Sequence, residues 1–198
     1  MMDFKPRGIV PPIVTPMKNG KVNHLVLRQL IDHLIQQGVH GVFPMGTTGE
    51  FYSFSEEEYR EILTTTVEAV DGRVPVYGGA NHITTRGVIR QIEICEEVGV
   101  DAVSVLTPMF VSVTQDELYD YFADIAASTS LPIIMYNNQP KTGVALYPST
   151  AAKLAEIKNI VGVKDSTGDM TNGAEYLRLT QNNEEFSVLM GRDTLIYA

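Results

Sequence analysis

Cysteine is scarce in this 198-residue chain, which contains only Cys95. A lone cysteine excludes an internal disulfide and a metal site built from CxxC pairs. Within the segment QIEICEEVG we expect it to be a small buried side chain. The histidines His24, His33, His40 and His82 show no ligand spacing such as HExxH. The sequence therefore predicts neither a disulfide nor a bound metal.

Basic residues are also few, because 15 lysines and arginines stand against 24 aspartates and glutamates, for a formal net charge of −9. Phosphate binding requires clustered basic side chains, so this balance argues against a nucleic-acid partner. Charged or turn residues interrupt every apolar run, which argues against a transmembrane helix. The N-terminal segment MMDFKPRGIVPPIVTP lacks the apolar stretch and cleavage site of a signal peptide. We therefore predict a cytoplasmic protein without a membrane partner.

What the sequence does contain is a unit that repeats about every 25 to 30 residues, as βαβ units do. Each unit has a short apolar run, a loop rich in glycine, threonine or proline, and an amphipathic helical stretch. The runs do not alternate with polar residues, which is typical of parallel strands covered by helices on both faces. The predicted strands are residues 8–16, 41–46, 74–80, 101–108, 132–137, 160–166 and 186–191. The predicted helices are residues 24–38, a helix that opens at Ser55, and residues 85–98, 114–128, 149–157 and 171–181.

Two parallel architectures compete, the closed barrel and the open doubly wound sheet. Residues capable of chemistry follow several different strands, namely Thr47, Tyr136, Lys164 and Asp193. An open sheet would gather them at one switch point, whereas a barrel places them around one rim. The chain also lacks the GxGxxG and GxxxxGK[ST] loops of nucleotide-binding sheets. We therefore predict the α/β class and a (β/α)8 TIM barrel.

The length poses a problem for a complete barrel. Eight units usually take about 250 residues, whereas we count seven strands in this chain. We therefore expect residues 1–198 to be a single (β/α)-barrel domain that represents an N-terminal portion, truncated after strand 7, with strand 8 and the C-terminal helices absent.

Lys164 ends the run NIVGVK, at the rim of the sixth predicted strand. Burial disfavours an ammonium group, lowers the pKa of the lysine and frees its amine to form a Schiff base with a carbonyl. Tyr136 ends the preceding strand and should lie at the same rim, where a phenol relays protons. These residues alone leave two alternatives open. Lys164 could reach solvent or pair with Asp165, and Tyr136 could be an ordinary core residue.

The segment GTTGE, residues 46–50, follows the second predicted strand. Its glycines permit a tight turn with amides that point inward. The hydroxyls of Thr47 and Thr48, together with such amides, would form a cradle for a carboxylate. A turn selected only for its shape is the alternative.

Taken together, these elements resemble the dihydrodipicolinate synthase and N-acetylneuraminate lyase superfamily. The resemblance covers essentially the whole chain, from PPIVTP and GTTGE to the TP after the fourth strand, YN…TG after the fifth, GVKDSTGD at the sixth and GRD after the seventh. It implies a homotetrameric (β/α)8 barrel followed by C-terminal helices. It implies neither a metal nor an organic cofactor.

The resemblance also assigns roles to individual residues. Lys164 would form the Schiff base with pyruvate or another 2-oxo acid, and Tyr136 would act as the general acid and base beside it. Thr47 would support the proton relay. Thr48, with Gly46 and the neighbouring amides, would hold the carboxylate of the 2-oxo acid.

Two positions depart from the family pattern. Phe110, in TPMFV, stands where synthases carry a tyrosine that completes a proton relay across a subunit interface. Lys141, in YNNQPKTG, stands where an arginine binds the carboxylate of the second substrate. A lysine offers a point charge without the bidentate fork of arginine. Both changes concern the second substrate and the relay, and neither concerns Schiff-base formation.

The sequence thus predicts a lyase of the class I aldolase type that acts on small molecules, a 2-oxo acid and an aldehyde. The activity implied first is the joining of pyruvate to aspartate semialdehyde. An aldolase, dehydratase or hydratase-aldolase for another 2-oxo acid is an alternative, as is a non-catalytic relative that only binds 2-oxo acids.

Overall fold

The computed structural model describes residues 4–196, which group into two compact units. Within these residues, unit 1 comprises 4–6, 82–88 and 105–196, and unit 2 comprises 7–81 and 89–104. The boundaries after residues 88 and 104 fall inside a helix and a strand. A single domain over residues 1–198 stays a prediction.

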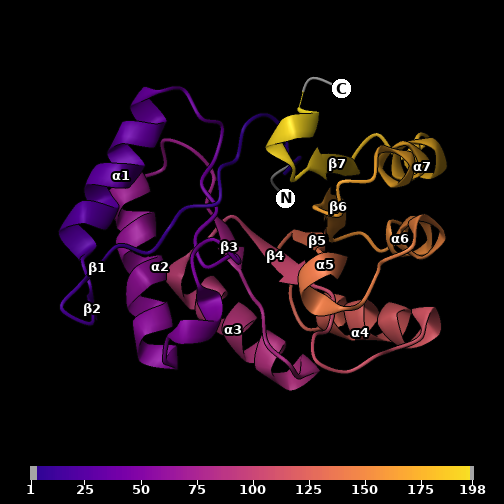
Figure 1. The fold of residues 1–198 in the computed structure, drawn as a ribbon, viewed down its shortest axis with the longest axis horizontal. Coiled ribbons are helices and arrows are strands. Elements are labelled where there is room, and N and C mark those ends of the chain that lie inside the picture. The colour runs from indigo at the N-terminus through magenta and orange to yellow at the C-terminus, as the bar shows by residue number, and fades with distance from the viewer. Residues whose placement is uncertain (1–3, 197–198) are drawn as a thin grey trace. The chain divides into compact units, whose positions relative to one another are not determined.

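Unit 2 is built around the first helices of the chain. Helices α1 and α2 lie side by side (Figure 1), and Leu27 and Ile31 of α1 are fully buried. Helix α2 starts with the predicted capping box, in which Ser55 accepts from the Glu58 amide and the Glu58 carboxylate accepts from the Ser55 amide. The elements of this unit are β1 (Met17–Lys18), β2 (Lys21–Val22), α1 (His24–Gln36), the 3-10 helix η1 (Phe51–Ser53), α2 (Glu56–Val70), β3 (Tyr77–Gly79), most of α3 (Thr85–Val98) and the start of β4 (Ala102–Leu106).

The first two predicted strands of the barrel are shorter than expected. Residues 8–16 and 41–46 meet through a parallel bridge between Pro12 and Phe43 instead of a continuous ladder. Proline has no N–H to donate, so Pro12 and Pro44 interrupt the hydrogen bonds that a longer ladder requires. The apolar pattern therefore includes the residues that form β-bridges, Pro12, Val42 and Phe43, but overestimates the length of both strands, since residues 44–46 form a turn and a bend.

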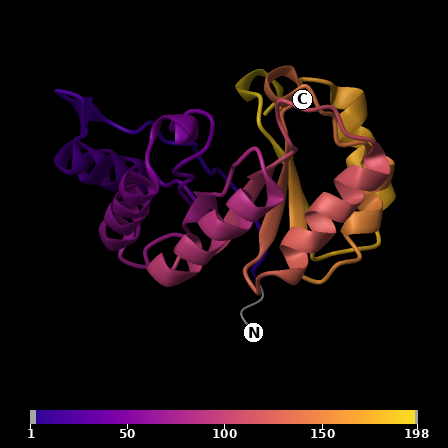
Figure 2. The ribbon, with the colours of Figure 1, turned by 90° about the horizontal axis from the view of Figure 1, so that it is seen from below.

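Unit 1 carries three neighbouring parallel strands in the order β5–β6–β7. Helices α4, α6 and α7 lie along one face of these strands (Figure 1 and Figure 2). The elements are the end of β4, α4 (Gln115–Ala127), β5 (Ile133–Asn137), α5 (Gln139–Thr142), α6 (Pro148–Leu154), β6 (Ile160–Asp165), α7 (Met170–Thr180), β7 (Ser187–Met190) and the 3-10 helix η2 (Asp193–Leu195). The predicted alternation of parallel strands and helices, and with it the α/β class, is confirmed.

The register of β5 against β6 decides which side chains meet. Tyr136 pairs with Lys164, and Asn137 pairs with Asp165. Because successive side chains of a strand point to opposite faces, the first pair shares one face of the sheet and the second pair shares the other.

Three small features were not expected: the hairpin β1–β2, the 3-10 helix η1 and the four-residue helix α5. None has an apolar period long enough to reveal it. Within residues 4–196, no helix is both long and apolar enough to cross a membrane.

Candidate active site

Lys164 and Tyr136 face each other at the carboxyl ends of β6 and β5. Lys164 Nζ lies 4.2 Å from the centroid of the Tyr136 ring, an arrangement in which the ring face attracts the cation. Lys164 also forms a hydrogen bond with the Tyr136 phenol. The structure therefore brings together the two residues that the sequence placed at one rim.

The Lys164 side chain is partly buried, and burial has the largest influence on its charge. Removal from water lowers the pKa of the Lys164 ammonium below its ordinary value, while Tyr136 and Asp193 oppose this by favouring the charged form. Asp193 belongs to η2, which follows β7. A lowered pKa leaves more of the lysine as the neutral amine, which is the form that attacks a carbonyl carbon.

The phenol oxygen of Tyr136 has another neighbour, Asn138, which lies between β5 and α5. Asn138 Nδ2 donates a hydrogen bond to Tyr136 Oη over 3.2 Å, and only 7% of Asn138 is exposed. Asn138 is not among the predicted site residues, because it lies outside the predicted strands and directly before helix α5, which was not predicted.

A buried polar network occupies the opposite face of the same strands. Asp165 is fully buried, and its carboxylate accepts from Asn137 Nδ2 at 2.9 Å and from Thr167 Oγ1 at 2.7 Å. Tyr176 of α7 accepts from Asn137 Nδ2 at 3.1 Å and donates to the Leu146 carbonyl. These bonds satisfy a carboxylate that would otherwise be costly to bury, and they tie β5, β6 and α7 together directly behind the lysine–tyrosine pair.

Gly191 closes this region from the end of β7. Its amide donates to the Asp165 carbonyl over 2.7 Å. A Cβ atom at this position would lie 2.0 Å from Ser166 Oγ and 3.0 Å from Lys164 Cε. Glycine is therefore required for the backbone to pass this close to the lysine stem.

The predicted carboxylate cradle, residues 46–50, lies in unit 2. The Gly49 amide donates to the Gly46 carbonyl at 3.0 Å, and the Glu50 amide donates to the Thr47 carbonyl at 3.2 Å. Thr48 is exposed. Thr47 Oγ1 is buried and has no hydrogen-bond partner among the described residues. A buried hydroxyl without a hydrogen-bond partner lowers the stability of the folded protein by about 1–3 kcal/mol. Thr47 Oγ1 is therefore available to form a hydrogen bond with a ligand or to take part in a proton relay.

The backbone beside this turn is held by contacts within unit 2. Thr15 Oγ1 donates to the Gly49 carbonyl over 2.8 Å, and Asn81 Nδ2 donates to the Met45 carbonyl over 3.3 Å. A Cβ at Gly79 would lie 2.1 Å from the same Met45 oxygen. The turn is thus anchored at both ends by buried groups.

The two residues that depart from the family pattern are in contact with solvent. Lys141 is exposed in the last turn of α5. Phe110 is 95% exposed and has a φ of +80°, which is unusual for a residue with a side chain. The predicted substrate-binding role of Lys141 stays a prediction.

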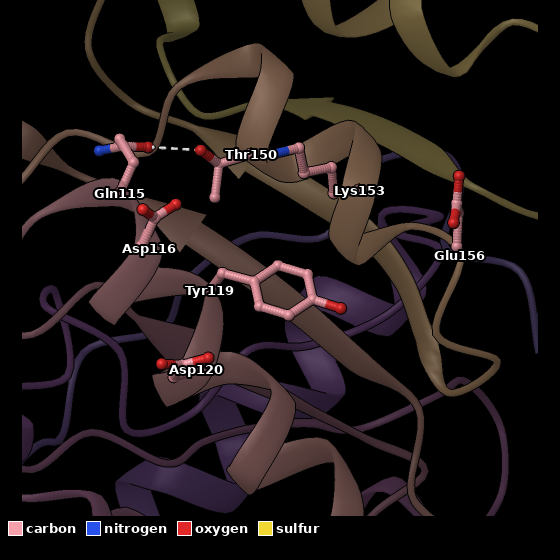
Figure 3. Close-up of a pocket in the computed structure, with 7 residues that line it drawn as sticks. All are labelled: Gln115, Asp116, Tyr119, Asp120, Thr150, Lys153 and Glu156. Carbon is pink, nitrogen blue, oxygen red and sulfur yellow. Dashed lines mark hydrogen bonds between the residues drawn. The ribbon is translucent and has the colours of Figure 1, made fainter.

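A separate hollow lies between α4 and α6, with a volume of about 480 Å³ (Figure 3). Gln115 and Thr150, two of its lining residues, are joined by a 2.7 Å hydrogen bond. Its lysine, Lys153, is exposed, so it lacks the burial that favours the neutral amine of Lys164. This hollow contains none of the predicted site residues.

Among residues 4–196 there is no group of three histidine, cysteine, aspartate or glutamate side chains that could hold a metal ion.

The model of the dihydrodipicolinate synthetase family matches residues 5–198. The chain belongs to this family. The resemblance drawn from GTTGE, Tyr136 and GVKDSTGD is therefore confirmed.

Individual members of the dihydrodipicolinate synthetase family agree with this. The 4-hydroxy-tetrahydrodipicolinate synthase of Syntrophus aciditrophicus is 40% identical over 94% of this chain and 64% of its own length. The solved 4-hydroxy-tetrahydrodipicolinate synthase of Methylacidiphilum fumariolicum has a TM-score of 0.93 and 35% identity, over 96% of this chain and 63% of its own. YagE of Escherichia coli K12, solved in complex with pyruvate, has a TM-score of 0.91 and 32% identity, over 94% of this chain and 63% of its own.

The (β/α)8-barrel class is confirmed by this likeness to dihydrodipicolinate synthases. The chain spans about 64% of the length of the curated relatives it matches. Of the predicted site residues, the structure brings Lys164 and Tyr136 into contact, and it places Gly46, Thr47 and Thr48 in unit 2. Their catalytic and binding roles in a dihydrodipicolinate synthetase stay predictions.

Proposed function

We propose that the protein is a lyase of the class I aldolase type, which binds pyruvate or another 2-oxo acid covalently on Lys164. The observation that carries this proposal is the contact between Lys164 and Tyr136 at the ends of β6 and β5. A partly buried lysine with a lowered pKa supplies the nucleophilic amine, and a phenol in hydrogen-bond contact with it supplies the proton shuttle.

The steps follow from this pair. The neutral Lys164 amine attacks C2 of the 2-oxo acid, and Tyr136 transfers a proton from the nitrogen to the former carbonyl oxygen. That oxygen takes a second proton and leaves as water, so that an imine forms. Loss of a proton from C3 gives the enamine, whose C3 forms a carbon–carbon bond with an aldehyde carbon while the aldehyde oxygen accepts a proton. Water then attacks the imine carbon, the carbon–nitrogen bond breaks as the nitrogen takes up a proton, and the product leaves with the free lysine restored.

The turn at residues 46–50 holds the 2-oxo acid in this proposal. The Thr48 hydroxyl and the backbone amides after Gly46 bind its carboxylate, as amide nests bind anions. The buried, unpartnered Thr47 Oγ1 takes part in the proton relay, which would satisfy a hydroxyl that otherwise costs stability.

The substrate pair proposed first is pyruvate with aspartate semialdehyde, the 4-hydroxy-tetrahydrodipicolinate synthase reaction. The names of the curated relatives support it, and pyruvate bound to YagE supports the 2-oxo acid half. A homotetramer without a metal or organic cofactor is part of the same proposal. The cytoplasmic location stays a prediction.

A second candidate is favoured by Phe110 and Lys141. Phe110 offers no hydroxyl to a relay, and the exposed Lys141 offers no bidentate fork to a substrate carboxylate. Both observations favour an aldehyde partner other than aspartate semialdehyde, in an aldolase, dehydratase or hydratase-aldolase. A binder without turnover would form the imine and consume neither substrate.

Borohydride trapping tests the proposal. The protein is incubated with pyruvate, reduced with borohydride and analysed by intact mass and peptide mapping. We expect one reduced pyruvate adduct on Lys164 in the wild type, the same adduct in the control Lys153→Ala, and none in Lys164→Ala. Labelling that persists in a folded Lys164→Ala variant, or no labelling of the folded wild type, contradicts the proposal. Measuring the consumption of the aldehyde then distinguishes the two cases, because an enzyme consumes the aldehyde and a binder does not.

A further inference from the structure

Asn138 stands at the position where an asparagine usually caps a helix. An N-cap asparagine normally accepts a hydrogen bond from a backbone amide in the first turn. In the described structure, the side chain of Asn138 makes no such bond to α5. The helix is held by the Asn138 backbone, whose carbonyl accepts from the amides of Lys141 at 2.8 Å and Thr142 at 3.0 Å. The amide side chain is therefore used elsewhere.

That side chain is directed to the phenol of Tyr136. Asn138 Nδ2 lies 3.2 Å from Tyr136 Oη, and only 7% of Asn138 is exposed. A buried amide needs a partner, and this N–H has one in the phenol oxygen. The neighbouring Asn137, which is the last residue of β5, directs its side chain to the opposite face, where it donates to Asp165. The two adjacent asparagines thus serve different faces of the strand.

A donor at this oxygen has a chemical consequence. An N–H that donates to an oxygen stabilises that oxygen when it carries negative charge. It also occupies one lone pair, so the phenolic proton must be directed away from Asn138. Lys164 Nζ, 4.2 Å from the ring centroid, lies beside the same phenol. The amide and the amine together limit where the Tyr136 proton can move.

We propose that Asn138 is a positioning residue for Tyr136, holding the phenol oxygen in place and stabilising it while its proton is on the substrate. The role rests on the proposed function, in which Tyr136 shuttles protons during imine formation.

The substitution Asn138→Asp tests the role with little change in size, since it replaces the N–H donor by an acceptor. We expect kcat to fall roughly tenfold to a hundredfold, somewhat less than the loss of a full oxyanion donor, with KM for pyruvate changed less than about threefold. Gln139→Glu is the matched control, because it places the same charge one residue away on an exposed side chain. We expect it to retain wild-type kcat.

A double-mutant cycle with Tyr136→Phe separates positioning from a general structural effect. If Asn138 acts through the phenol, Asn138→Asp causes no further loss once the phenol is absent. An equal fold-loss in both backgrounds overturns the proposal. Asn138→Ser, which removes the amide without adding charge, replaces the first variant in the same cycle if Asn138→Asp does not fold.

A readout independent of turnover distinguishes this proposal from the proposed function. The ζ-carbon NMR resonance of Tyr136, assigned by its loss in Tyr136→Phe, reports the hydrogen bonding of the phenol oxygen. We expect it to move in Asn138→Asp or Asn138→Ser and to stay in place in Gln139→Glu. An unmoved resonance refutes the Asn138 role even if pyruvate labels Lys164. A moved resonance without any pyruvate adduct refutes only the function on which the role depends.

Discussion

At the scale of single residues, Phe110 and Lys141 depart from the sequence pattern that the resemblance to dihydrodipicolinate synthases implies. Phe110 is almost wholly exposed in a backbone conformation with positive φ, and Lys141 is exposed in α5. Neither is part of the lysine–tyrosine contact on which the proposed imine formation depends. Changes at these two positions should therefore alter the reaction with the second substrate and leave capture of the first unaffected.

Restoring the hydroxyl at position 110 tests this separation. We expect Phe110→Tyr to raise turnover of pyruvate with aspartate semialdehyde by roughly tenfold or more, because a positioned acid or base contributes about 10²–10⁴-fold. The rate of borohydride labelling by pyruvate should not change. The control Met109→Tyr places the same phenol one residue earlier. Equal rates for both variants and the wild type would mean that the missing hydroxyl does not limit the reaction.

Whole elements were predictable where their signals are local. The capping box of Ser55 and Glu58 fixed the start of α2, and the helical period located α3 at residues 85–98. The order of strands also placed Lys164 beside Tyr136, since consecutive parallel strands are usually neighbours. The partners of Asn137 lie 28 and 39 residues away, so no local pattern could reveal the network behind the site.

Tyr176→Phe tests how that network joins α7 to the strands. The substitution removes the acceptor of Asn137 Nδ2 and the donor to the Leu146 carbonyl. Since both groups are buried, we expect the free energy of unfolding to fall by about 1–3 kcal/mol in a urea titration. Tyr147→Phe, at a tyrosine that is 56% exposed, should cost less than about 0.5 kcal/mol. Similar losses in the two variants would show that the Tyr176 hydroxyl has no special role.

At the scale of the whole molecule, the fold class and the family could be predicted, and the division into two units could not. The chain passes between the units after residues 6, 81, 88 and 104. The alternation of apolar runs and helices continues across the last three of these boundaries, and no linker-like segment marks them. Of the predicted site residues, Lys164 and Tyr136 belong to unit 1 and Thr47 belongs to unit 2.

Lys164 itself should lower the stability of the folded protein in a pH-dependent way. Burial lowers the pKa of Lys164 in the folded protein below the ordinary value of 10.5. At pH values between the lowered pKa and 10.5, the unfolded chain binds more protons than the folded one. The free energy of unfolding therefore rises with pH in this range. The cost of the buried charge is fully present below the folded pKa and vanishes above 10.5. We therefore expect Lys164→Met to unfold at a higher urea concentration than the wild type near neutral pH.

That advantage should shrink as the pH approaches the ordinary lysine value, because the wild-type lysine then loses its charge in both states. Urea titrations at a series of pH values measure the difference in unfolding free energy between wild type and Lys164→Met. Lys153→Met is the control, since its lysine is exposed and its removal should give no difference that depends on pH. A Lys164→Met advantage that grows with pH would contradict the lowered pKa, and with it the physical basis for a neutral amine at this position.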